Sequence, residues 1–196
     1  MNPSTGRRPA TRGVFAVEQQ EMILPDPIAL DTSFVVEALI ATQPLHHVCN
    51  AFLIRIGDSG VSVATSELLR VELAEAAFAI ALKERWGGQW RRHRTDGRSR
   101  PRAGRLLNDT ISRYDEMLGT LTHISIRLGR VARPTITLMT DYGLASYDAV
   151  HAASAIAAGA EAIVTLDTGF ALLPPSLLAI YTDRSRLASC RSKRGR

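Results

Sequence analysis

The chain has 196 residues, of which 45% are hydrophobic and 22% are charged. This length and composition suit one globular domain with its own core, and the two cysteines, Cys49 and Cys190, exclude a disulfide framework. No stretch approaches the roughly 20 apolar residues of a membrane span, and the basic N-terminus lacks the apolar region of a signal peptide. We therefore expect a cytoplasmic protein with reduced thiols and no membrane partner.

The net charge of +5 is unevenly distributed. Residues 83–105 carry nine basic and two acidic residues, and residues 184–196 carry six basic residues and no acid. The segments 28–82 and 106–183 together carry six basic and fourteen acidic residues. An acidic body with basic appendages suits a protein that holds an anionic polymer, although basic loops and tails that only aid solubility would have the same composition.

The first half of the chain begins with a Pro- and Gly-rich segment, residues 1–27, for which we expect weak order. A buried strand over 28–31 follows, and then a helix from Ser33 to about Ile40. The pattern next predicts a helix from Pro44 to about Ile56, a strand over 60–64, and a long helix that begins at Thr65 or Ser66 and ends near residue 83.

The second half begins with a basic loop over residues 87–105. We expect a helix over 105–128, a short segment over 134–143 that is helix rather than strand, and a helix over 146–158. Strands are predicted at 162–165 and 178–181, and the basic tail 184–196 ends the chain. Apolar strands that alternate with helices predict an α/β fold, in which a central parallel sheet is covered by helices on both faces.

Four acidic residues lie in apolar or small-residue surroundings: Asp31, Glu72, Asp148 and Asp167. Buried carboxylates are unfavourable without a cation or hydrogen-bond donors, and of these stretches only that of Glu72 contains a basic residue, Arg70. Ligand sites in open α/β sheets lie outside the carboxyl ends of the strands, where Asp31 and Asp167 fall. Because hard oxygen ligands suit Mg²⁺ or Mn²⁺, the four acids predict a divalent metal site.

Each of these acids also has a simpler explanation. Asp31 and Asp167 could form turns or caps, and Asp148 could only complement a helix dipole. Glu72 shares its helix with Glu67 and Glu75, and we favour Glu72 as the site residue.

Two further side chains have a possible role beside the acids. His151 lies one turn after Asp148, where it could hydrogen-bond to that carboxylate or simply be a partly buried helix histidine. Ser33 is as well explained by helix capping as by a place beside the metal.

Four segments resemble the motifs of PIN domains, and in particular of VapC toxins from bacterial toxin–antitoxin pairs. They are Leu30-Asp31-Thr32-Ser33, Ser66 to Glu72, Tyr147 to Ala153, and Val164 to Phe170. The resemblance covers roughly residues 28–182 and implies a PIN-like three-layer fold over 28–183. It implies a Mg²⁺- or Mn²⁺-dependent endoribonuclease with Asp31, Glu72, Asp148 and Asp167 as metal-binding and catalytic residues, and with Ser33 and Thr165 nearby.

The resemblance also implies partners: an RNA substrate, a cognate antitoxin that blocks the acidic cleft, and a second copy in a homodimer. Arginines of the basic loop and tail would contact the RNA backbone, and in the loop we single out Arg91, Arg92, Arg94 and Arg98. Trp86 and Trp90 could stack on bases or only pack. Two alternatives remain: a PIN nuclease of RNA processing without an antitoxin, and a non-catalytic PIN module that binds nucleic acid or protein.

Overall fold

Six parallel strands form one sheet within residues 12–195, the part of the chain that this computed structural model describes. The strand order is β1-β6-β5-β2-β3-β4, so β5 and β2 lie at the centre. The register pairs Leu30 with Val164 and Ala29 with Ala64. The strands are β1 (Val14–Ala16), β2 (Ile28–Leu30), β3 (Val63–Ser66), β4 (His123–Ile126), β5 (Ala162–Val164) and β6 (Ala179–Thr182). The parallel α/β fold predicted from the sequence is confirmed.

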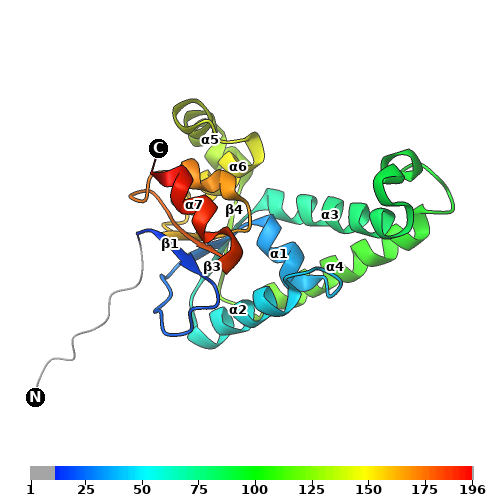
Figure 1. Ribbon diagram of the computed structural model, residues 1–196, viewed down its shortest axis with the longest axis horizontal. Helices are drawn as coiled ribbons and strands as arrows, with labels where there is room; N and C mark the ends of the chain where they lie inside the picture. The colour runs from blue at the N-terminus through cyan, green and yellow to red at the C-terminus, as the bar shows by residue number, and fades with distance from the viewer. Residues whose placement is uncertain (1–11, 196) are drawn as a thin grey trace, which may run out of the picture.

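Helices cover both faces of this sheet (Figure 1). They are α1 (Thr32–Leu39), α2 (His46–Ser59), α3 (Glu67–Trp86), α4 (Arg100–Thr120), α5 (Leu128–Tyr142), α6 (Ser146–Ala157) and α7 (Leu187–Arg194), with short 3-10 helices η1 (Gly87–His93), η2 (Thr168–Leu172) and η3 (Arg184–Arg186). One core contains residues of α1, α2 and the first part of α3, and the other contains residues of α5, α6 and α7. Among residues 12–195, no helix is long and apolar enough to cross a membrane.

The alternation of side chains along the strands explains the two cores. In β2, Ile28 and Leu30 belong to the core under α1 and α2, whereas Ala29 belongs to the opposite core. Both faces of β2 are therefore buried, as a central parallel strand requires. On the second face α6 presents small buried residues such as Ala149 and Ala152, which let its backbone approach the sheet closely.

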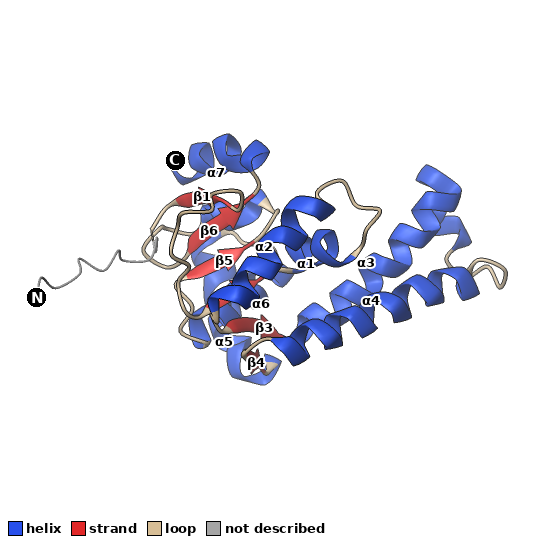
Figure 2. Cartoon of the chain, turned by 90° about the horizontal axis from the view of Figure 1, so that it is seen from below, coloured by secondary structure: helices blue, strands red, loops and turns tan. Residues whose placement is uncertain are grey.

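The outer part of α3 and the first part of α4 extend away from the sheet as a helical hairpin (Figures 1 and 2). We call residues 78–107, which include η1 and the connecting turn, the arm. The arm has a small apolar cluster of its own, in which Leu82 and Ala103 are buried and Phe78, Trp86 and Trp90 pack around them. The basic segment 87–105 is therefore folded around this cluster, rather than being the loop that the sequence predicted.

The prediction of one helix over 105–128 is wrong at its end. Helix α4 stops at Thr120, and β4 then pairs with β3 along its whole length. The β-branched residues Thr122, Ile124 and Ile126 alternate through this stretch, which favours a strand. The next helix, α5, begins at Leu128 and contains Pro134 in its interior rather than at its start.

Both ends of the described chain also differ from the prediction. Within the supposed extension 1–27, β1 pairs with β6, and the Phe15 ring lies 5.3 Å from the ring of Tyr181. At the other end, α7 occupies most of the expected tail and buries Cys190. The segments that form β1 and α7 are too short to show a periodic pattern in the sequence. Their structure depends on apolar contacts with the sheet. The remainder of these predictions, residues 1–11 and 196, lies outside the described residues.

Candidate active site

Asp31 is the most firmly oriented of the four acids. It follows β2, caps α1 and is only 4% exposed. Its Oδ2 accepts hydrogen bonds from the Ser33 amide at 3.2 Å, the Ser33 hydroxyl at 2.5 Å and the Thr165 hydroxyl at 2.8 Å. Three donors on one oxygen compensate for its burial, and the other oxygen, Oδ1, lies 4.0 Å from His151 Nε2.

Ser33 and Thr165 also connect the ends of the two central strands. The Leu166 amide donates to the Ser33 hydroxyl at 2.9 Å, and the Asp167 amide donates to the Thr165 hydroxyl at 2.9 Å. These bonds hold the residues after β5 beside those after β2. The sequence placed both hydroxyls near the site, and the structure shows that they position it through Asp31 and through backbone amides.

Asp148 and Asp167 approach each other across Gly169. Asp167 caps η2, with its Oδ1 2.6 Å from the Gly169 amide nitrogen. A Cβ atom at position 169 would lie 3.0 Å from Asp148 Oδ2 and 3.1 Å from Asp167 Oδ1. Burial and the negative charges of Asp167 and Asp31 raise the pKa of Asp148 from 3.8 to about 6. The carboxylates therefore repel one another, which a bound cation would relieve.

Glu72 is bound by two side chains of the protein, His151 and Thr32. Its Oε2 lies 2.5 Å from His151 Nε2 and accepts the Thr32 hydroxyl at 2.5 Å. Burial opposes its ionisation, yet the hydrogen bonds from His151 and Thr32 lower the pKa of Glu72 below its usual range. Burial would likewise lower the pKa of His151, but Glu72 and Asp31 raise it. Both directions describe a carboxylate–imidazolium pair.

The sequence left two interpretations of His151 open, a hydrogen bond to Asp148 or a buried helix histidine; the structure buries it and pairs it with Glu72. Its other nitrogen, Nδ1, lies 3.1 Å from the Ser66 hydroxyl. Although Ser66, His151 and Glu72 thus form a chain, Ser66 is only 2% exposed and cannot reach a substrate as a nucleophile. The chain fixes the orientation of Glu72. Neither Thr32 nor Ser66 was predicted to contact the site; the position of Thr32 beside Asp31 was the one local signal for it.

The neighbours of Glu72 on α3 have other partners. Glu67 accepts the Leu128 amide at 3.2 Å, and Glu75 forms an ion pair with Arg94. Of the three glutamates, Glu72 is the one that contacts the residues around Asp31. Arg91, Arg92, Arg94 and Arg98 all lie in the arm, where Arg94 binds Glu75 of α3.

The chemistry of these side chains fits a divalent cation, since carboxylate oxygens are the ligands that Mg²⁺ and Mn²⁺ prefer. Their present spacing is wider than a coordination shell: within residues 12–195, no three His, Cys, Asp or Glu side chains are close enough together to bind one ion. A cleft of about 540 Å³, lined by Thr32, Ser33 and Asp167 among others, lies beside them. Asp31, Asp148 and Asp167 would hold the ion, and Glu72 would have to leave His151 to join them.

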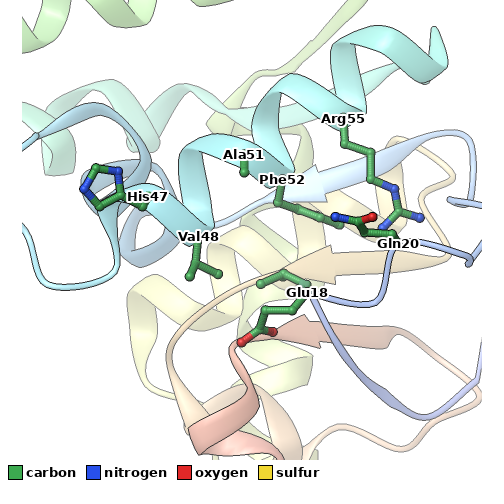
Figure 3. A pocket seen from close by; sticks show the side chains of 8 residues that line it. Glu18, Gln20, His47, Val48, Ala51, Phe52 and Arg55 are labelled. Atoms are coloured by element: carbon green, nitrogen blue, oxygen red, sulfur yellow. The ribbon is translucent and has the colours of Figure 1, made fainter.

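A separate hollow of about 580 Å³ lies between α2 and the segment after β1 (Figure 3). The hollow is lined by Phe52, Val48, Glu18 and Arg55 among others, and none of the four acids lines it. Arg55 there donates to the carbonyl oxygens of Gln19 and Met22, so it ties this segment to α2. We assign the active site to the acidic edge of the sheet rather than to this hollow.

The comparison with known families identifies this architecture. The PIN domain family model matches residues 28–174, and the chain belongs to the PIN domain family. PIN domains are generally nucleases and usually use divalent metals. The matched range contains all four acids. The crystal structure of PAE2754 from Pyrobaculum aerophilum is similar at a TM-score of 0.47 and 17% identity, over 85% of this chain and 90% of that chain. None of the curated proteins matches the chain.

Proposed function

We propose that this protein is a metal-dependent endoribonuclease and the toxin of a type II toxin–antitoxin pair. The observation that carries the proposal is that Asp31, Asp148 and Asp167 gather at the carboxyl edge of the sheet in a chain of a nuclease family. The VapC-like motifs around these residues support the toxin assignment.

The residues of the chain have distinct roles in this proposal. Asp31 presents a fixed carboxylate because Ser33 and Thr165 hold one of its oxygens. Asp148 and Asp167, whose carboxylates lie close together beside Gly169, would hold the same ion. A bound Mg²⁺ or Mn²⁺ would offset the repulsion between these acids and a phosphodiester and would make water a competent nucleophile near neutral pH.

Cleavage of RNA tests the enzymatic part. We expect cleavage of a mixed pool of cellular RNA with Mn²⁺ or Mg²⁺ and none in excess chelator. Asp31→Asn and Asp148→Asn should each reduce the rate at least about 100-fold while the circular dichroism spectrum stays unchanged. Asp141→Asn, an exposed acid on α5, is the matched control and should cleave like the wild type. Full activity in chelator or in both site variants would overturn the proposal.

Growth arrest tests the toxin part. Expression of the wild-type chain should arrest growth, and the Asp31→Asn chain should not. Co-expression of a small adjacent reading frame should relieve the arrest, and its product should purify with the chain. We propose that this antitoxin covers the acidic cleft and that the chain forms a homodimer. RNA cleavage without arrest or relief would instead identify a PIN nuclease of RNA processing.

One observation favours a second candidate, a PIN module that binds without catalysis. One of the four acids already has a partner from the protein itself: Glu72 Oε2 lies 2.5 Å from His151 Nε2, a contact that raises the pKa of the imidazole against the effect of burial. Isothermal titration with Mn²⁺ separates the candidates, because a module without metal chemistry would show no binding that depends on Asp148 and Asp167.

A further inference from the structure

The arm carries a dense set of exposed cations. They are Lys83, Arg85, Arg91, Arg92, Arg94, Arg98, Arg100, Arg102 and Arg105. Only Arg94 has an ion-pair partner within residues 12–195, since its guanidinium binds Glu75 at 2.5 Å. The two acids of this segment serve other groups: Glu84 accepts the Thr42 hydroxyl, and Asp96 accepts the Arg98 amide and the Ser99 hydroxyl. The remaining cations therefore face solvent without neutralisation.

The cations of the basic C-terminal segment bind groups of the protein itself, unlike those of the arm. Arg186 pairs with Asp183, Lys193 donates to the Thr168 hydroxyl at 2.8 Å, and Arg194 donates to the Gly13 carbonyl at 2.8 Å. Arg191 donates to the Val14 carbonyl. These cations hold α7 against the sheet, so the arm is the main basic surface that is left for an external anion.

The tip of the arm is a folded surface rather than a loose loop. The Trp86 indole N–H donates to the Ser99 hydroxyl at 3.1 Å, which links the two helices across the tip. Ser99 is 2% exposed and itself donates to Asp96 at 2.9 Å. The His93 ring stacks on Trp86 with a centroid distance of 3.7 Å. The cations of η1 consequently have defined positions.

The indole rings of the arm are occupied by the protein's own side chains. Lys83 and Arg91 lie 5.4 and 5.0 Å from the centre of the Trp90 ring, and Arg85 lies 5.1 Å from that of Trp86. Such cation–π contacts hold the charges in place and leave little ring surface for stacking on bases. These contacts favour binding of phosphates by the arm over base-specific recognition.

We propose that the arm binds the phosphodiester backbone of RNA, at a distance from the acidic edge and without base preference; this inference rests on the proposed function. Helix α3 connects the two regions, because Glu72 lies near its start and Trp86 ends it. Glu72 and Trp86 are about 21 Å apart along the helix at about 1.5 Å per residue; the cations after Trp86 fold back from there, and Arg94 reaches Glu75. One RNA strand can span the distance from Glu72 to Trp86 in about six nucleotides at a stacked spacing of about 3.4 Å, so the arm would anchor the strand that the acidic edge cleaves.

Binding in chelator tests this inference separately from cleavage. The probe is a fluorescein-labelled 20-nucleotide single-stranded RNA, and the readout is its anisotropy with the full-length chain in EDTA. The arm variant is the triple Arg91→Gln, Arg92→Gln, Arg98→Gln. The control is the triple Arg127→Gln, Arg130→Gln, Arg133→Gln on α5, which removes the same charge from equally exposed positions.

We expect the arm variant to bind at least 10-fold more weakly than the wild type, with a salt slope reduced by about 2, since each lost phosphate contact removes about 0.7. The control should stay within 2-fold, and oligo-U and oligo-A should bind within 3-fold of each other. Equal losses in both variants, no loss in the arm variant, or a strong base preference would overturn the inference. Equally effective competition by poly-glutamate would point instead to an acidic protein partner and would also overturn it.

The two proposals can fail independently in these experiments. If the arm variant binds RNA normally while cleavage still needs Asp31, the arm inference is wrong and the nuclease stands. If the arm variant loses binding while Asp31→Asn cleaves normally, the arm inference survives and the proposed catalysis fails.

Discussion

The acidic edge of the sheet and the tip of the arm use charge in opposite ways. At the edge, the buried Asp31, the half-buried Asp148 and the exposed Asp167 carry like charges, and burial together with the other two charges raises the pKa of Asp148 to about 6. At the tip, unpaired arginines stay exposed around a small apolar cluster. Burial makes repulsion strong at the edge, whereas water screens it at the tip. A bound cation would relieve the repulsion at the edge, whereas the exposed arginines of the tip are screened by water without a partner.

Alanine substitutions at two glycines, one in each region, should give the largest difference in RNA cleavage. Gly169→Ala should lower RNA cleavage about 100-fold, because the added Cβ would lie 3.0 Å from Asp148 Oδ2 and displace both acids. Gly104→Ala in the arm should leave activity unchanged and raise stability by up to about 1 kcal/mol, since nothing lies within 4 Å of its Cβ. Initial rates and thermal melts measure both effects. Cleavage by Gly169→Ala within twofold of the wild type would show that the two carboxylates need no such proximity.

The independence of the arm core is tested by Leu82→Ala. The side chain is 2% exposed, and its removal should destabilise the arm by about 2–3 kcal/mol. Hydrogen exchange should accelerate in residues 78–107 and stay unchanged in β2 and β5. Loss of protection throughout the sheet would mean that the arm and the domain fold as one cooperative unit.

The repulsion at the acidic edge is tested by pH. Because Asp148 binds its proton more tightly in the folded state, with a pKa of about 6 against 3.8, the free energy of unfolding in chelator should fall as pH rises between those values. Asp148→Asn should abolish this fall and stabilise the protein at pH 7.5 by about 1–2 kcal/mol, after allowance for partial solvent screening. Denaturant melts at pH 4 and pH 7.5 provide the measurement, with Asp141→Asn as the control. A wild type that is equally stable at both pH values would argue against the repulsion.

The smallest effect is expected at Arg94. Its ion pair with Glu75 is about half exposed on both sides, so Arg94→Gln should cost about 0.5 kcal/mol in stability. RNA affinity should fall less for Arg94→Gln than for Arg92→Gln, because Glu75 already neutralises Arg94. The anisotropy assay described above compares the two single variants. A larger loss at Arg94 would mean that RNA displaces Glu75.

Motif and pattern were sufficient for the core of the fold, and they named three aspartates that the structure places at the carboxyl edge of the sheet; their role as a metal site stays a prediction. Apolar runs such as 28–30 and 162–164, each followed by an acid, indicated central parallel strands with carboxylates at their ends. The strands β1 and β4 and the helix α7 escaped prediction because they are short and gain their stability from neighbours distant in the sequence. The roles of individual basic residues could not be predicted from the sequence for the same reason. Arg94 and Arg194 are both arginines in basic segments, and they differ only in the residues that they contact.

By itself, the sequence determined that this is an α/β chain with four acids in apolar surroundings and two basic segments, because local periodicity and composition carry that information. The tertiary structure alone decided that Glu72 pairs with His151 and that the C-terminal cations stabilise the fold. It also decided that the arm cations other than Arg94 have no ion-pair partner among residues 12–195. Such contacts join residues that are far apart in the chain, and their energies depend on distance and burial, which local sequence does not specify.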